Sequence, residues 1–334
     1  DSDIIAGMRW AAGLSVDGVS PAISQPRARV INLSLGSDAA TCSLAYRDAV
    51  AAVNAVGVVV VAAAGNGSMG VESPASCDGV IAVAALRHVG TKTHYSSLGP
   101  QVAISAPGGN CVNATGSCLY PILTAANSGI QNPVSAADGG SSYRIVWGTS
   151  FAAPMVSGTV ALMFAVRPEL TPDAVKRVLV RSARPFPTSG AGDLLPCQAS
   201  TTVEQPECYC TTSTCGAGML DTAGAVAQAV STGLAVVSVS PVAPTVGTRV
   251  TLTGSDSVPS AMGNRITSYQ WELVDGGGIV SALSGDLASS SISATPSAAG
   301  SFLVRLTVVD DASEVAITEK TVVVSAVPSS GGGG

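Results

Sequence analysis

The chain has 334 residues, of which 46% are hydrophobic and only 11% charged, and this composition predicts a soluble, tightly packed protein long enough for two domains. Its net charge of -6 is spread along the sequence without a basic stripe, so nucleic acid is excluded as an expected partner. The longest apolar stretches run about a dozen residues, which predicts core elements rather than membrane spans.

From residue 1 to 232, helical patterns alternate with short apolar strands. Thr171, Pro172 and Asp221 stand at the starts of two expected helices, where capping residues and proline are favoured. Strands and helices in alternation predict an α/β domain with a parallel sheet and flanking helices. The sequence predicts helices over 3–14, 42–57, 171–183 and 220–230 and after Ser150, and strands within 28–36, 58–65, 79–86 and 101–108.

Near residue 233 the pattern changes to strands separated by Gly, Ser, Asp and Pro. The apolar side chains recur at every second position, which places one row of them on one face of each strand. Residues 233–327 are therefore expected to form a small all-β, immunoglobulin-like sandwich, and residues 328–334 a Gly/Ser-rich tether. The alternating residues are Tyr269, Trp271 and Leu273 in one strand, and Phe302, Val304, Leu306 and Val308 in another.

Eight cysteines accompany only two histidines. The "CYC" at 208–210 does not have the spacing of a zinc ligand pair, so disulfides in an oxidising compartment, the periplasm or the cell exterior, are the better interpretation. The chain begins "DSDIIAGMRW", without a recognisable signal peptide, which we interpret as a mature product or a fragment. The cysteines are Cys42, Cys77, Cys111, Cys118, Cys197, Cys208, Cys210 and Cys215.

The stretch "GTSFAAPMVSG" at 148–158 places Ser150 at the start of an expected helix. A serine hydroxyl becomes a nucleophile when a base removes its proton and a positive site receives the oxyanion, and the free N–H groups of a helix N-terminus supply part of that site. A helix cap is the alternative role for Ser150. The segment "AAAGN" ends a buried strand with Asn66, whose side-chain amide is a hydrogen-bond donor.

Together with "INLSLG", "VVVAAAGN", "SPASCDGVIAVAAL" and "HYSSLGPQVAISAPG", the serine motif resembles the second half of a subtilisin-like serine protease domain, peptidase S8, over residues 1–232. The resemblance implies a secreted or cell-surface serine endopeptidase that acts on proteins or peptides, with Ser150 as the nucleophile and Asn66 in the oxyanion hole. It implies no cofactor for catalysis and allows structural calcium, although the sequence identifies no metal ligands. A monomer is expected.

The same resemblance assigns the substrate-binding residues. Ser34, Leu35 and Gly36 match the strand that pairs with the substrate, and Ala63, Ala64 and Gly65 match the opposite wall of the first specificity pocket. Because Gly67 follows Asn66, this wall is expected to be small and uncharged, which favours apolar substrate side chains.

The family requires an Asp-Thr/Ser-Gly motif and a His-Gly-Thr motif, and neither occurs in these 334 residues. His88 and His94 lie in an expected loop and are interpreted as surface or packing residues. The chain is therefore expected to be an inactive fragment without the N-terminal part of the sheet, which would leave the strand in 28–36 at an exposed edge. The alternative is a non-catalytic binding or adhesion protein on a decayed protease fold.

Relatives also suggest a Cys42–Cys77 disulfide, and Cys111 with Cys118 would close a short local loop. The remaining four cysteines permit three connectivities. The segments "YQWEL" and "SFLVRLTVVDDASE" make residues 233–327 similar to a PKD-like module, whose role would be surface or substrate binding, or that of a spacer. Trp271 is expected to be a core residue.

Overall fold

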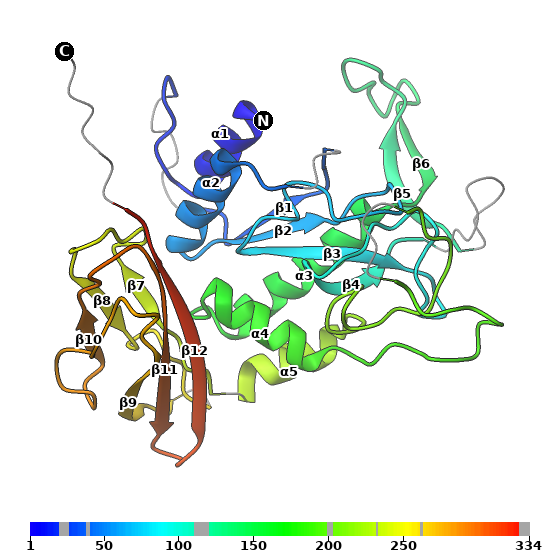
Figure 1. Cartoon of the computed structure of the whole chain (residues 1–334). Coiled ribbons are helices and arrows are strands. Elements are labelled where there is room, and N and C mark those ends of the chain that lie inside the picture. Colours follow the sequence, from blue (N-terminus) through cyan, green and yellow to red (C-terminus); the bar gives the residue numbers. More distant parts are fainter. Residues whose placement is uncertain are drawn as a thin grey trace. The chain divides into compact units, whose positions relative to one another are not determined.

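The computed structural model describes residues 1–19, 27–37, 41–109, 120–198, 203–231, 233–260 and 263–326. The chain divides into two compact units, one formed by residues 1–165 with 175–226 and the other by residues 166–174 with 227–334 (Figure 1). We call them the protease unit and the sandwich unit and treat each by itself. The expected tether at 328–334 lies outside the described residues.

The protease unit is built on a parallel sheet of four strands in the order β1-β2-β3-β4. Every residue of β2 and β3 is buried, as the apolar runs in the sequence predict for strands covered on both faces. The strand β1 forms one edge of this sheet. The bounds are β1 Val30–Leu33, β2 Val59–Ala63, β3 Val80–Leu86 and β4 Val102–Pro107.

Helices cover both faces of the sheet. The helices α1 (Ser2–Ala11) and α2 (Leu44–Ala55) lie on one side and α3 (Thr149–Val166) on the other (Figure 1). Met8 of α1 and Val50 of α2 belong to the same buried cluster as Val60 of β2, which shows how the first two helices are held against the sheet. The α/β architecture expected from the sequence is therefore present.

The helix α3 has two unlike faces. Its buried residues recur three or four positions apart, which is the spacing of one helix face: Thr149, Ala152, Ala153, Val156, Thr159, Val160, Met163 and Phe164. The exposed face is also apolar and consists of Pro154, Met155, Gly158, Ala161, Leu162 and Ala165. The whole of α3, eighteen residues, is long and apolar enough to meet the length and composition criteria for a membrane span. The apolar stretch within it that the sequence analysis considered is shorter. The regular burial of one face is what a core helix shows.

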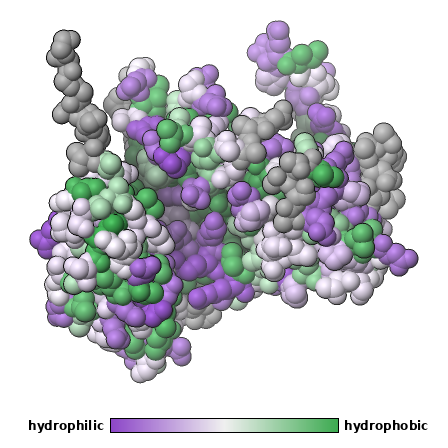
Figure 2. All heavy atoms as spheres, in the orientation of Figure 1, coloured by the Kyte–Doolittle hydropathy of each residue, from purple (hydrophilic) through white to green (hydrophobic). Residues whose placement is uncertain are grey.

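An antiparallel hairpin formed by β5 (Ile122–Asn127) and β6 (Ser141–Val146) leads into α3. It extends away from the four-stranded sheet (Figure 1), and the cross-strand neighbours Leu123 and Ile145 are 66% and 65% exposed. The sequence analysis did not predict this hairpin, because its residues lack the long apolar run of the buried strands. In the face drawn in Figure 2, hydrophobic residues lie in small patches among hydrophilic ones.

The remaining helices begin where the capping residues indicated. Thr171 Oγ1 accepts a hydrogen bond from Ala174 N at 3.3 Å at the start of α4 (Pro172–Ser182), whose first residue is the expected proline. Asp221 Oδ1 accepts from Gly224 N at 2.8 Å at the start of α5 (Thr222–Ser231). Both side chains satisfy N–H groups that have no partner within the helix.

Three disulfides lie within the described residues of the protease unit: Cys42–Cys77, Cys197–Cys208 and Cys210–Cys215. The first is the pair expected from the resemblance, and the other two resolve the three connectivities that the sequence left open. Cys111 and Cys118 lie outside the described residues. The sulfur atoms of Cys197, Cys210 and Cys215 cluster within 4.8 Å of one another, but all three belong to disulfides and are not thiolates for a metal.

The sandwich unit contains two antiparallel sheets, β10-β8-β7 and β12-β11-β9. The alternation expected in β11 is present, because Phe302, Val304, Leu306 and Val308 are all buried in one cluster. Trp271 of β9 is 2% exposed and its Nε1 donates to Ser289 O at 3.0 Å, so it is a core residue as expected. The bounds are β7 Ser238–Ser240, β8 Val250–Thr253, β9 Ile266–Asp275, β10 Ser291–Ala294, β11 Gly300–Asp310 and β12 Val315–Val324.

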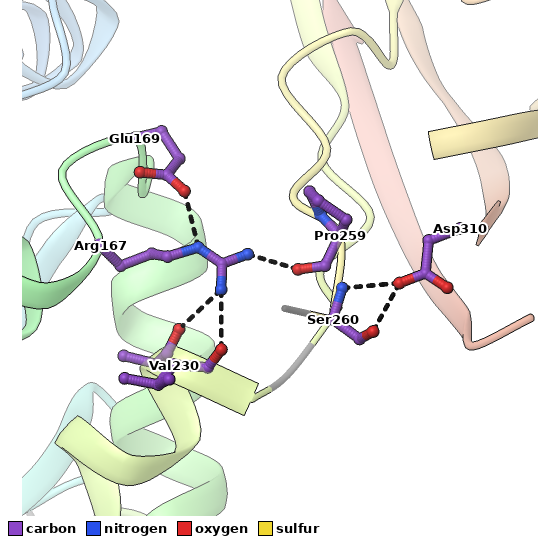
Figure 3. A network of polar contacts seen from close by, with 7 residues as sticks. Arg167, Glu169, Val230, Pro259, Ser260 and Asp310 are labelled. Carbon is purple, nitrogen blue, oxygen red and sulfur yellow. Dashed lines mark hydrogen bonds and ion pairs between the residues drawn. The ribbon is translucent and has the colours of Figure 1, made fainter. Parts of the chain in front are cut away.

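Two buried charged side chains form hydrogen bonds with loops of the sandwich unit (Figure 3). Arg167, 1% exposed, donates to the carbonyl oxygens of Val230 at 2.9 Å and of Pro259, and its Nε pairs with Glu169 at 2.7 Å. The carboxylate of Asp310 accepts from Ser260 N at 2.8 Å and from the Ser260 hydroxyl at 2.5 Å. These hydrogen bonds to the charged form hold the pKa of Asp310 well below its usual range.

Candidate active site

Ser150 lies in the first turn of α3, and the backbone that precedes it is tightly held. Gly148 N donates to Gly108 O at 2.9 Å, and the Tyr95 hydroxyl donates to the same oxygen at 2.5 Å. Gly148 has φ +138°, a conformation that favours glycine, and it turns the chain from β6 into the helix. Burial raises the pKa of Tyr95 to about 12, so this hydroxyl remains a donor at neutral pH.

The end of β1 contacts the first turn of α3 through two reciprocal hydrogen bonds. Ser34 Oγ donates to Ser150 O at 2.7 Å, and Ser150 Oγ donates to Ser34 O at 3.2 Å. Asn32 extends the network, because its Nδ2 donates to Ser34 Oγ at 2.8 Å while its Oδ1 accepts from the Ser157 hydroxyl at 3.0 Å. The nucleophile candidate and the expected substrate strand are therefore adjacent.

Asn66 lies on the other side of the same helix end. Its Oδ1 accepts from Thr149 N at 2.9 Å and from Thr149 Oγ1 at 3.0 Å, and Thr149 Oγ1 also contacts the backbone of Gly65. With Oδ1 occupied in this way, the amide Nδ2 has its two N–H groups for another acceptor. The structure thus brings Asn66 to the N-terminus of α3, next to Ser150, although more than eighty residues separate them in sequence.

The residues expected to form the pocket walls occupy the ends of β1 and β2. Ala63 is 3% exposed and Ala64 is fully buried, whereas Leu35 is 38% exposed at the surface. The expectation of an uncharged wall is wrong, because the carboxylate of Glu72 lies there. Glu72 Oε1 accepts a hydrogen bond from Asn66 N at 3.0 Å.

Both histidines have aromatic neighbours. The ring of His88 lies 4.5 Å from that of Tyr120, and the ring of His94 lies 5.4 Å from that of Tyr95 and 6.1 Å from that of Trp147. The exposed His88 and the half-buried His94 fit the surface or packing role that the sequence analysis gave them.

A buried lysine holds the segment that carries His94. Lys92 is 1% exposed, and its Nζ donates to Gln205 O at 2.7 Å, to His94 O and Thr93 O at 2.9 Å each, and to Ser68 Oγ at 3.1 Å. Burial lowers the pKa of Lys92 to about 7, with Glu204 opposing the shift. The ammonium group joins three loops of the protease unit.

Sequence reasoning missed Thr149, Asn32 and Glu72 at this site. Thr149 was read only as part of the serine motif, yet it orients Asn66. Glu72 had a detectable signal, since it is an acidic residue in the otherwise apolar and small stretch "GVESPASC".

Comparisons with known proteins identify the families of two parts of the chain. Residues 1–209 match the subtilase family of peptidase S8, and residues 242–324 match a family of PKD domains. The chain is 41% identical over 194 residues to an extracellular protease of Xanthomonas campestris, covering 57% of this chain and 30% of that protein. It is 35% identical over 192 residues to an extracellular basic protease of Dichelobacter nodosus, covering 56% of this chain and 29% of that one.

A solved protease structure from Pseudoalteromonas arctica shares 35% identity with the chain at a TM-score of 0.56, covering 68% of this chain and 58% of the other. The chain thus spans about a third of the length of the first two relatives. Since the family match covers well over half of the residues, this chain belongs to the subtilase family of serine proteases.

Proposed function

We propose that the chain supplies the nucleophile and oxyanion-binding part of a secreted serine endopeptidase. The observation that carries the proposal is the position of the Asn66 amide against Thr149, at the helix N-terminus that presents Ser150. Two donors, Asn66 Nδ2 and the Ser150 N–H, are near the hydroxyl that would attack a peptide carbonyl.

The reaction that this site supports is acyl transfer. Ser150 Oγ attacks the scissile carbonyl, the oxyanion is received by Asn66 and by the helix N-terminus, and collapse of the tetrahedral intermediate leaves an acyl-enzyme that water hydrolyses. The backbone of residues 34–36 pairs with the substrate before the scissile bond, and residues 63–65 wall its first pocket. The contact between Ser150 Oγ and Ser34 O breaks when a base takes the hydroxyl proton.

The base and its orienting carboxylate, in this proposal, come from a segment outside these 334 residues. The support is structural: one apolar face of α3 is exposed, with Leu162 at 52% and Met155 at 38%, and β1 forms a sheet edge. Exposed apolar surface of this kind marks an interaction site. We use "complete protease" for this chain together with the segment that supplies the Asp and His motifs.

Secretion is supported by the three disulfides and by the extracellular relatives. The sandwich unit, with its tryptophan in the core, is proposed to act as a spacer or as a surface for substrates, through residues other than Trp271.

Labelling with a fluorophosphonate probe tests the proposal. The complete protease is expected to be labelled on Ser150, and Ser150→Ala is expected to abolish the label, whereas Ser182→Ala at the end of α4 keeps it. The 334-residue chain alone is expected to react far more slowly. A complete protease that remains unlabelled would instead support the non-catalytic binding protein.

A further inference from the structure

The side chain of Glu72 lies between the two backbone segments that the proposed function gives to the substrate. Its main chain is fixed on both sides, because Glu72 N donates to Ala64 O at 2.9 Å and Ser37 N donates to Ser73 O at 3.0 Å. The segment therefore bridges the end of β2 and the end of β1, and Glu72 is anchored at the middle of the bridge.

Three glycines make room for the carboxylate of Glu72. A Cβ atom on Gly36 would lie 2.8 Å from Oε2, a Cβ atom on Gly67 would lie 3.6 Å from Oε1, and a Cβ atom on Gly65 would overlap the carboxyl group. Glu72 itself is half-buried. A negative charge thus lies within the space between residues 34–36 and residues 63–67, beside glycines that carry no side chain.

A half-buried carboxylate in a binding pocket selects among the side chains that enter. An apolar side chain would strip water from the charge and return no hydrogen bond, which is costly. A guanidinium or ammonium group would pair with the charge, and guanidinium adds two parallel donors. We propose that Glu72 makes the first specificity pocket select basic side chains, arginine over lysine, immediately before the scissile bond. This inference rests on the proposed function of the Ser150 site.

A purely structural role for Glu72 would be to hold Asn66 N through Oε1. The substitution Glu72→Gln separates the two roles, because glutamine keeps a carbonyl oxygen for Asn66 N and loses the charge. Asp78→Asn is the matched control, since Asp78 is exposed on the same segment, a short way further along the chain.

The kinetic experiment compares peptide substrates that differ only in arginine, lysine or leucine before the cleaved bond. For the complete protease, kcat/KM is expected to be at least about ten-fold higher for arginine than for leucine, in keeping with a charged hydrogen bond in a partly buried site. Glu72→Gln is expected to lower the arginine-to-leucine ratio of kcat/KM most of the way to one, and Asp78→Asn is expected to keep the wild-type ratio. An arginine-to-leucine ratio unchanged by Glu72→Gln, or a preference for leucine in the wild type, overturns the inference.

A binding experiment separates this inference from the proposed chemistry. Calorimetric titration of the 334-residue chain with acetyl-Ala-Ala-Pro-Arg and with the same peptide carrying neutral citrulline needs no acyl transfer. Tighter binding of the arginine peptide, lost in Glu72→Gln, supports the charged pocket even where the fluorophosphonate test fails. Equal binding of the two peptides, or no binding of either, overturns it.

Discussion

The two units of the molecule differ in where their hydrogen-bonded polar side chains lie. The sandwich unit buries the charged Arg167 and Asp310 among hydrogen-bond partners and encloses its apolar row in β11. The protease unit leaves Asn66 and Ser34 exposed at one end of its sheet and leaves an apolar face of α3 in solvent. The difference indicates that the buried polar groups of the sandwich unit contribute to stability, whereas Asn66 and Ser34 remain in contact with solvent.

The largest expected effect is that of Asn66→Ala on catalysis. In a subtilisin, removing a side-chain oxyanion donor lowers kcat by about 10² to 10³; our proposal gives Asn66 this role, so a similar loss is expected for the complete protease. Asn66→Ala also removes the acceptor of Thr149 N and Oγ1, so the free energy of unfolding is expected to fall, but only by about 1 kcal/mol, because Asn66 is exposed and water can replace its oxygen. Steady-state kinetics and differential scanning calorimetry give the two readouts. A fall in stability that matches the fall in kcat would mean that Asn66 is a structural residue, like those of the sandwich unit.

The exposed face of α3 gives the second prediction. Leu162→Asp is expected to change the free energy of unfolding of the 334-residue chain by no more than about 0.5 kcal/mol, because Leu162 is 52% exposed. In the complete protease the same charge would be buried without a partner, and a loss of about 3 kcal/mol or more is expected. Urea unfolding of both proteins measures the difference.

Val323→Asp is the control, since Val323 is 66% exposed in β12 and should respond equally in both proteins. Equal tolerance of Leu162→Asp in the two proteins would contradict our proposal that another segment of the protease covers α3.

The contrast between the units also explains what the sequence could predict. Buried parallel strands such as β2 and β3 are continuous apolar runs, and the starts of α4 and α5 carry side chains whose capping chemistry is local. These elements were predicted because a few adjacent residues determine them. The exposed β5–β6 hairpin has no comparable pattern, and it was missed.

The site was predictable only in part, for a related reason. Ser150 and Asn66 stand in motifs that can be recognised one at a time. Glu72 and Thr149 matter through contacts across the fold, such as Glu72 Oε1 with Asn66 N and Thr149 N with Asn66 Oδ1. The carboxylate of Glu72 comes to lie beside Gly36 and Gly65 only because the 71–75 segment joins two strand ends.

Lys92 departs from this difference between the units, because it is a buried ionisable side chain in the protease unit. Its pKa is lowered by burial to about 7, so between pH 7 and its unfolded value near 10.5 the unfolded chain binds more protons than the folded one. Stability contributed by this group therefore rises with pH across that window and is at its lowest below pH 7.

Lys92→Met removes the titration. Relative to this variant, the free energy of unfolding of the wild type is expected to rise by a few kcal/mol from pH 7 to pH 10. Guanidinium unfolding at several pH values provides the measurement. A constant difference across the window would show that the four oxygen acceptors of Lys92 hold its pKa near that of an exposed lysine.

Arg167→Met tests the sandwich side of the comparison. Methionine has a similar length and replaces the packing of the Arg167 stem, but the carbonyl oxygens of Val230 and Pro259 lose their donor (Figure 3). Since a buried polar group left without a partner costs about 1–3 kcal/mol, the free energy of unfolding of the sandwich unit should fall by that amount. Hydrogen exchange of the β11 amides, analysed separately from those of β2 and β3, reports on this unit alone.

Arg305 is the control for this substitution. It is partly exposed on β11 and paired with Glu272 and Glu319, so Arg305→Met should cost less stability than Arg167→Met. Equal losses for the two arginines would mean that burial of Arg167 adds nothing beyond an ordinary surface ion pair, and the contrast between the units would not hold.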